Sequence, residues 1–367
     1  MYRIYANGRP LHHPNQFADG VIVSDPVLSQ SLNAHGSLEF SVPPTNQLYG
    51  EIATNTTTVT VLGDTGEIWR GRAISIDKGW DNFLRVYCEG ELAYLTDTIY
   101  RPYVHRGSVA RLFNLLVINH NGQVDASRRF TAGDCTVTDP NDNIYRAWSE
   151  AGNTWEIFKT KLIDTLGGFL RVRVENGIRY LDYLADSDTE SDQEIAYGSN
   201  LLDLTRTADG AEMITRLIPY GARFEQDDPH YEEEPQSGGW DGNRLTISGA
   251  TDYVSNAAAE AIYGAIYGTQ IFDDITIESN LITAANAALT ERIAAASAIT
   301  IDARAFDRSA VENVSALNVG DYVRVRSAMH DINIRLMVRS KRLPLMRPGD
   351  AEIVLGAGRK TLTDLRG

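Results

Sequence analysis

Cysteine is nearly absent from this sequence, because the 367 residues include only Cys88 and Cys135. Two cysteines cannot build a disulfide framework, and neither lies beside the second Cys or the His that a metal knuckle requires. We therefore expect two buried, inert thiols. Long apolar runs are also missing: no segment approaches the ~18 apolar residues that span a bilayer, and the polar residues 1–10 do not resemble a signal peptide. The sequence predicts a protein that is made in the cytoplasm and is not secreted by the ordinary route.

Positive charge is scarce as well. The chain has 34 Lys and Arg against 49 Asp and Glu, which gives a formal net charge of -15. Such a balance disfavours nonspecific attraction to nucleic acid or to anionic membranes. Only five of the basic residues are Lys. The planar fork of Arg suits paired contacts at interfaces, and an Arg-rich coding bias explains the count equally well.

Catalytic signatures are missing too. The sequence contains no His-Glu-x-x-His, Gly-x-Ser-x-Gly, Gly-x-x-x-x-Gly-Lys or Gly-x-Gly-x-x-Gly motif, and its seven His are scattered. The acidic stretches lack the full spacing of a calcium loop, so we predict no metal and no cofactor. A hydrolase would have to use Cys135, which lies on a turn, or a pair of carboxylates whose proximity the sequence does not reveal. We predict that the chain is not an enzyme and keep a cell-wall hydrolase as an alternative.

Apolar residues make up 43% of the chain, which is enough for two to four domain cores. Residues 1–100 alternate apolar and polar positions between turn signals, a pattern typical of an antiparallel sheet or small barrel. Helical spacing then appears after Ser108 and after Thr154, each expected to cap its helix, and Gly167–Gly168 is expected to stop the second helix. A hairpin with a type I′ turn at Asn176–Gly177 is predicted next.

Strand patterns resume at Leu201 and return after residue 299. Between them, residues 225–241 hold seven acidic residues and no Lys or Arg, which indicates an exposed loop. Helices are predicted in 254–263 and 278–296. Because one β module lies near the start and another surrounds these helices, we predict an α+β, multidomain fold with two small antiparallel β-barrels, each carrying an α+β insert.

One charged face could dock a partner. Residues 299–347 contain nine basic and five acidic residues inside a strongly acidic protein. The strands predicted there place apolar residues on one face and mostly Arg on the other. The candidate docking residues are Arg324, Arg326, Arg335 and Arg339. Such a face could bind an acidic partner or line a passage for DNA, although a solvated strand face is the simpler interpretation.

Exposed tryptophans offer a second kind of binding site. Trp80, Trp148 and Trp240 could stack on sugars, as in a carbohydrate-binding adhesin. Trp240 is the leading candidate because it follows Gly238–Gly239 in the acidic loop.

Several phrases, in a fixed order along the whole chain, resemble the N-terminal hub region of the phage tail-associated family, often labelled prophage tail endopeptidase or minor structural tail protein. The phrases are Leu38–Tyr49, Gly66–Arg72, Cys88–Leu95, Gly167–Arg173 with Tyr180–Leu184, Thr215–Ala222 and Val319–Val325. The family is similar in plan to the baseplate hubs of contractile tails. Because no hydrolase motif is present, the endopeptidase activity in the family's label is not expected here.

The resemblance implies a homotrimeric hub at the tail tip of a siphovirus or prophage, that is, a structural protein located in the virion. It implies contacts with the distal tail protein ring, the tape measure protein and the host cell envelope, and in some relatives with a receptor-binding fibre. Phage DNA would pass through a channel that the hub closes until infection, without specific binding. A carbohydrate-binding host-adsorption protein remains the other alternative.

The same resemblance suggests the domain bounds. The first barrel is assigned to 1–100 and the second to 201–245 plus 298–367. The α+β inserts are assigned to 101–200 and 246–297.

Overall fold

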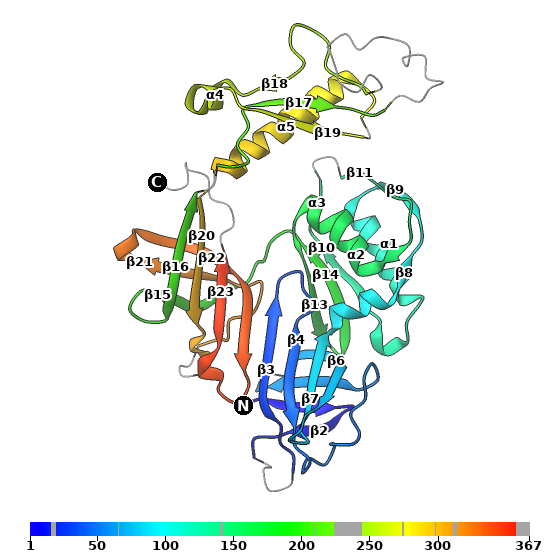
Figure 1. Cartoon of the computed structure of the whole chain (residues 1–367), viewed down its shortest axis with the longest axis vertical. Helices are drawn as coiled ribbons and strands as arrows, with labels where there is room; N and C mark the ends of the chain where they lie inside the picture. Colours follow the sequence, from blue (N-terminus) through cyan, green and yellow to red (C-terminus); the bar gives the residue numbers. More distant parts are fainter. Residues whose placement is uncertain are drawn as a thin grey trace. The chain divides into compact units, whose positions relative to one another are not determined.

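The structure, a computed structural model, describes residues 1–15, 20–64, 66–139, 142–208, 210–223, 244–273, 275–297, 299–310 and 314–356. The chain divides into two compact units. Met1–Leu204 and Asp302–Gly356 form unit 1, and Thr205–Ile301 and Ala357–Gly367 form unit 2. Figure 1 shows their elements coloured along the sequence.

A sheet of 13 strands is the framework of unit 1. Its order is β16-β20-β23-β22-β3-β4-β7-β6-β5-β1-β2, with β21 paired to β22 and β15 paired to β21. The strands are β1 (Arg3–Ala6), β2 (Arg9–His12), β3 (Ser24–Ser31), β4 (Ser37–Val42), β5 (Thr58–Gly63), β6 (Gly66–Lys78), β7 (Leu84–Gly90), β15 (Glu190–Ala196), β16 (Leu201–Ala208), β20 (Ile299–Phe306), β21 (Tyr322–Ser327), β22 (Ile332–Pro344) and β23 (Glu352–Gly356). In Figure 1 the blue strands β3, β4, β6 and β7 curl into a half-barrel.

Strand β22 joins the two ends of the chain in this sheet. Ile332–Met337 pair with β21, Met337–Arg342 pair with β23 with a register shift between Val338 and Ser340, and Ser340–Pro344 pair with β3. Leu343 and Leu345 consequently lie in the same hydrophobic core as strands β1 and β3–β7. The strands after residue 298 and those before residue 100 therefore share one sheet.

A helical layer with its own core lies between these strands in sequence. It holds α1 (Val109–Asn121), a continuous helical segment of α2 (Thr154–Phe158), η4 (Lys159–Ile163) and α3 (Asp164–Leu166), and the strands β8 (Ile99–Tyr100), β9 (Tyr103–Gly107), β10 (Thr131–Cys135), β11 (Ile144–Trp148), β12 (Gly152–Asn153), β13 (Phe169–Glu175) and β14 (Ile178–Leu184). Short 3₁₀ turns are η2 (Glu91–Asp97), η3 (Ala126–Arg128), η5 (Arg308–Ala310), η6 (Ala328–His330) and η7 (Pro348–Asp350). The apolar stripe of α1 packs on Phe158, Leu162 and Tyr183.

The caps and turns of this layer test the sequence predictions directly. The Ser108 hydroxyl accepts the Arg111 N–H, so this cap is confirmed. The prediction that Thr154 caps the second helix was wrong by one residue, because Asn153 Oδ1 accepts the Glu156 N–H. Thr154 is the first residue of the helix, and its side chain is buried. Asn176 and Gly177 both have positive φ, 51° and 79°, as a type I′ turn requires.

Unit 2 is a three-stranded sheet covered by a helix. The order is β18-β17-β19, with β17 (Arg216–Tyr220), β18 (Val254–Ser255) and β19 (Tyr267–Ile271). Helix α5 (Glu278–Ser297) packs Leu281, Ala285 and Leu289 onto this sheet, which confirms the helix predicted in 278–296. The other predicted helix begins later than expected, because Val254–Ser255 form β18 and α4 spans Ala257–Tyr263.

The α+β class predicted from the sequence is confirmed. Most pairings are antiparallel, and β10–β14, β15–β21 and β17–β19 are parallel. The division into two barrels with two inserts stays a prediction, as does the trimer. No helix in the described part of the chain is long and apolar enough to cross a membrane.

Candidate functional site

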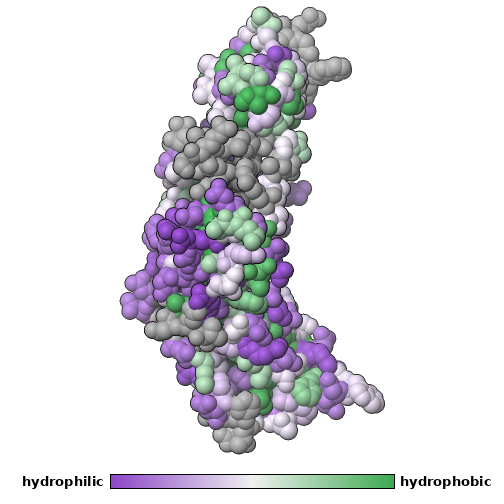
Figure 2. Space-filling view, turned by 90° about the vertical axis from the view of Figure 1, so that its left-hand side faces the viewer, coloured by the Kyte–Doolittle hydropathy of each residue, from purple (hydrophilic) through white to green (hydrophobic). Residues whose placement is uncertain are grey.

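The arginine face predicted from the sequence lies on the β21–β22 hairpin. Arg324 lies opposite Arg335 in the register, and the neighbouring pair is Arg326 and Asn333. Arg324, Arg326, Arg335 and Arg339 are all exposed, while the alternate positions of both strands are buried. Figure 2 turns the side of unit 1 that carries β15 and β21 toward the viewer, and hydrophilic residues predominate there. Because buried and exposed positions alternate along both strands, the four predicted Arg residues are exposed to solvent.

Carboxylates from β15 partly neutralise this face. Arg326 Nη1 lies 3.1 Å from Glu194 Oε1, and Arg335 Nε lies 3.3 Å from Glu190 Oε2. The Arg335 guanidinium also lies 3.9 Å above the centre of the Tyr322 ring. Arg324 forms no ion pair within the described residues, although it lies opposite Glu194 in the parallel register. The hairpin thus presents a strip of mixed charge in which Arg324 contributes the least compensated positive charge.

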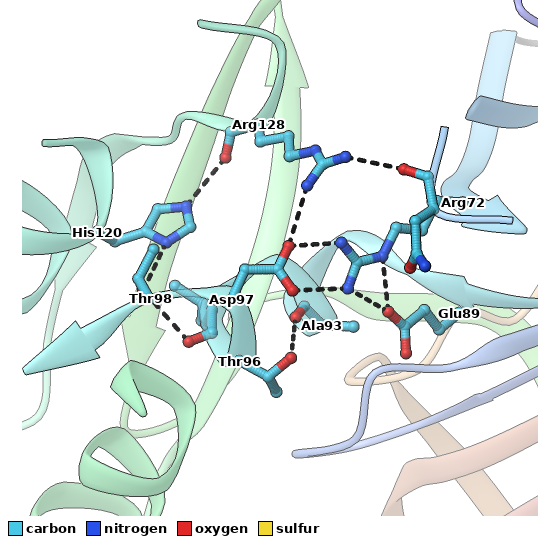
Figure 3. A network of polar contacts seen from close by, with 10 residues as sticks. Arg72, Glu89, Ala93, Thr96, Asp97, Thr98, His120 and Arg128 are labelled. Atoms are coloured by element: carbon cyan, nitrogen blue, oxygen red, sulfur yellow. Dashed lines mark hydrogen bonds and ion pairs between the residues drawn. The ribbon is translucent and has the colours of Figure 1, made fainter. Parts of the chain in front are cut away.

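A charged joint connects the half-barrel to the helical layer through η2 (Figure 3). Arg72 on β6 donates from Nε to Glu89 Oε1 and from Nη2 to Asp97 Oδ1, at 2.8 Å in both cases. Arg128 Nη1 reaches Asp97 Oδ2 at 3.2 Å. Both guanidinium groups lie over the Tyr94 ring, 5.4 and 5.7 Å from its centre. Because Asp97 ends η2, these contacts fix where the helical layer begins.

A buried histidine completes the joint. His120 Nε2 lies 3.0 Å from the Arg128 carbonyl, which can only accept, so Nε2 carries the proton. Its Nδ1 therefore accepts from the Thr98 hydroxyl at 3.1 Å (Figure 3), and the oxygen of this hydroxyl also lies 2.8 Å from Thr154 Oγ1. Burial lowers the pKa of His120 and keeps the ring neutral, despite the opposing contact with the Arg128 carbonyl. This cluster therefore has the character of a structural joint.

The other end of η2 carries a second charged cluster. Glu91 is only 7% exposed and accepts from Arg179 Nη1 at 2.8 Å through Oε2. Arg179 also donates to Glu67 Oε1 at 2.8 Å, whereas Arg70 Nη1 is 3.7 Å from Glu91 Oε1. Burial raises the pKa of Glu91 to about 7, and the attraction of Arg179 and Arg70 offsets only part of that effect. Glu91 is the most strongly perturbed carboxyl at this cluster.

A cavity of about 510 Å³ opens beside Glu91. Its walls come from the β3–β4 turn, the start of β6, the β13–β14 hairpin, and residues 316–319 with Lys341 and Leu343. Five basic and two acidic side chains line it, together with apolar groups such as Phe169. Within the described residues, the buried side-chain atoms without a hydrogen-bond partner are His35 Nε2, Trp69 Nε1 and Glu91 Oε1, and all three residues line this cavity.

The three tryptophans named as sugar platforms differ in their surroundings. Trp80 is fully exposed, with a relative accessibility of 101%. Trp148 is half-buried, donates from Nε1 to the Arg101 carbonyl at 2.8 Å, and contacts the rings of Tyr100 and Tyr103. Trp240 lies outside the described residues. A sugar site built from all three is therefore not tested.

Neither cysteine has the lowered pKa that a hydrolase nucleophile needs. Cys88 is fully buried, and burial raises its pKa above that of a free thiol. Cys135 is half-buried, and burial raises its pKa to about 11, so at neutral pH it is a thiol and not the nucleophilic thiolate. No group of three or more His, Cys, Asp or Glu in the described ranges is placed to hold a metal ion.

The comparisons with known proteins point to one class, the phage tail proteins. Residues 188–366 match the model of the family described as "Prophage endopeptidase tail". This match confirms the resemblance inferred from the sequence for residues 188–366, and the solved structures described next share the fold. A search of curated proteins gave no match.

Three solved structures share the fold. A 43 kDa tail protein of prophage MuSo2 from Shewanella oneidensis is 12% identical, with a TM-score of 0.61 over 100% of this chain and 99% of that chain. A tail protein from Neisseria meningitidis MC58 is 12% identical, with a TM-score of 0.61 over 97% of each chain. Prophage tail protein gp18 from Listeria monocytogenes is 13% identical, with a TM-score of 0.52 over 94% of this chain and 91% of that chain.

Sequence reasoning missed the cavity and its buried carboxylate. Glu91 follows Gly90, and a Cβ atom at residue 90 would lie 2.1 Å from the His35 carbonyl oxygen. This glycine lets the β3–β4 turn pass close to the start of η2. The available signal was a charged residue that directly follows a glycine and directly precedes the apolar stretch Leu92–Leu95. Its partner Arg179 lies 88 residues away, so no local pattern could have paired them.

Proposed function

We propose that this chain is a structural hub protein of a phage tail, which assembles as a homotrimer at the tail tip. There it joins the distal tail protein ring and the tape measure protein, and it closes the DNA exit channel until the tip meets the host cell envelope. The observation that supports this most is the likeness of fold to phage tail proteins over essentially the whole chain, together with the family match in residues 188–366.

The charge of the protein fits this role. A net charge of -15 on each copy would give an acidic channel wall, which repels DNA and lets it slide without specific binding. A receptor-binding fibre, where a tail carries one, would supply host specificity.

The mass of the protein in solution tests the assembly. We expect light scattering to give about three times the 40.6 kDa of one chain, and the trimer to bind a purified distal tail ring. Because subunit association follows mass action, the measurement should cover micromolar to near-millimolar concentrations. A strict monomer throughout that range, with no binding to the ring, would contradict the proposal.

The arginine face supplies a prediction about docking. Replacing Arg324, Arg326 and Arg335 with Ser should weaken binding to an acidic partner of the tail by about tenfold and reduce its salt dependence, because rim charges mainly steer association. Surface plasmon resonance at two salt concentrations measures both effects.

The matched control replaces Arg304 and Arg347, which are exposed Arg residues outside this face. Unchanged assembly and binding in the triple variant would remove the docking hypothesis and leave a solvated strand face.

A further inference from the structure

Trp80 is a large apolar side chain that is exposed to solvent. It lies in the turn between β6 and β7 with a relative accessibility of 101%. Within the described residues it has no ring contact, no cation–π contact and no hydrogen bond. The exposed indole gains none of the free energy that burying its large apolar surface would give. Tryptophan is also among the residues most enriched at binding hot spots.

The turn that carries Trp80 is held in one conformation. Gly79 N–H bonds the Phe83 carbonyl at 3.1 Å, and Asn82 N–H bonds the Gly79 carbonyl at 3.0 Å. The Tyr49 hydroxyl donates to the Asn82 carbonyl at 2.6 Å. Asp81 accepts from Arg85 Nη2 at 2.7 Å. Because the turn is fixed in advance, docking Trp80 would cost little conformational entropy.

The 510 Å³ cavity has the chemistry to receive an indole. Arg70 and Arg171 lie on its walls, and guanidinium groups stack well on indole faces. Phe169 and Leu343 add apolar surface. Glu91 Oε1 is a buried carboxyl oxygen without a hydrogen-bond partner, and an indole N–H is a donor.

Trp80 cannot reach the cavity of its own chain. The cavity is lined by residues 67–70 at the start of β6, whereas Trp80 follows the end of that strand at Lys78. Ten residues of extended strand span roughly 30 Å. Two complementary features at opposite ends of one subunit make a head-to-tail contact, which closes into a ring if the rotation between copies allows it.

We infer that Trp80 of one copy of this chain docks into the cavity beside Glu91 of a second copy, and that this contact holds the subunits of the hub together. The inference rests on the proposed self-association.

Removing the indole tests the contact directly. Trp80→Ser should raise the dissociation constant of the assembly by about thirtyfold or more, the size of a central hot-spot residue, without altering the fold. Sedimentation equilibrium measures the constant, and circular dichroism checks the fold. Ile118→Ser, which removes another exposed apolar side chain from α1, is the matched control and should associate like the wild type.

A second variant blocks the cavity without touching the core. Ala34 is exposed on the β3–β4 turn and lines the cavity, so Ala34→Trp fills it. At a concentration above the dissociation constant of the wild type but well below that of the variants, each variant alone should be monomeric. An equimolar mixture should form a dimer of about twice 40.6 kDa that does not grow further, because Ala34→Trp keeps the tryptophan and Trp80→Ser keeps the cavity.

The possible failures are distinguishable. If the wild type and Trp80→Ser form equally stable trimers, the contact is wrong and the hub proposal stands. If the wild type is monomeric at every concentration, both are wrong. If Trp80→Ser keeps the trimer but loses binding to the distal tail ring, the tryptophan docks on a different protein and the inference is overturned.

Discussion

Replacing Lys341 with Met is expected to lower the free energy of unfolding by about 3–5 kcal/mol, the usual cost of removing one partner of a buried ion pair. Lys341 is 6% exposed and Asp307 is 2% exposed. The Lys341 ammonium donates to Asp307 Oδ2 and to the Leu317 carbonyl, at 2.7 Å in both cases. In the variant the carboxylate would stay buried without a counter-ion.

The surroundings of Asp307 make this loss large. Gln193 Nε2 donates to Oδ1 at 2.8 Å, and the Leu317 N–H donates to Oδ2 at 3.2 Å. Burial alone would raise the pKa of Asp307, but the Lys341 charge and these donors outweigh it and lower the pKa. The site is therefore built around an ionised carboxylate, and it joins β15, β20, β22 and the segment before β21.

Urea denaturation followed by circular dichroism measures the effect. Arg347→Met removes an exposed cation that lies 3.5 Å from Asp350, and it should cost no more than about 0.5 kcal/mol. The double variant Lys341→Met, Asp307→Asn should recover most of the loss, because it removes the unpaired charge and keeps an acceptor for Gln193. A single variant as stable as the control would show that the pair is not a stability determinant.

Local elements of the fold could be predicted because short-range chemistry decides them. The Ser108 cap and the turn at Asn176–Gly177 depend on residues within a few positions of each other. The helix over Glu278–Ser297 follows from the spacing of its apolar residues. Asn153 was overlooked because Asn and Thr are both good caps, and the buried bond between the Thr98 and Thr154 hydroxyl groups decides between them.

Long-range assembly could not be predicted in the same way. Pairing of β22 with β3 brings Leu343 next to Leu28, residues that are more than 300 positions apart. Nothing in the pattern of either strand specifies this partner, because both read as ordinary alternating strands. The sheet that joins the two ends of the chain is therefore a finding of the structure.

The candidate sites also combine local features, which could be predicted from the sequence, with long-range features, which could not. Exposure of Arg324, Arg326 and Arg335 follows from alternation and was predictable. The ion pairs of Arg326 and Arg335 with carboxylates of β15 were not predictable, because they depend on a parallel pairing between Glu190–Ala196 and Tyr322–Ser327. The cavity beside Glu91 is also a product of tertiary packing, since segments far apart in the sequence form its walls.

Glu91 should make the stability of the protein depend on pH. Because its pKa is raised from 4.5 to about 7 by burial, the folded state holds this proton over a pH range in which the unfolded chain has released it. The stabilisation is fully present below pH 4.5 and is lost as the pH rises through about 7. A shift of this size corresponds to about 3 kcal/mol across the window.

Glu91→Gln removes the titrating group and keeps an oxygen that can accept from Arg179. We expect the wild type to lose about 3 kcal/mol more than this variant between pH 4.5 and pH 8, with little further difference above pH 8. Urea denaturation at intervals of half a pH unit measures both profiles. Glu352→Gln, at an exposed carboxylate 2.8 Å from Arg304, should follow the wild type. Parallel profiles for wild type and Glu91→Gln would mean that Arg179 and Arg70 compensate the burial of Glu91 fully, and that the carboxyl group is ionised in the folded protein throughout this range.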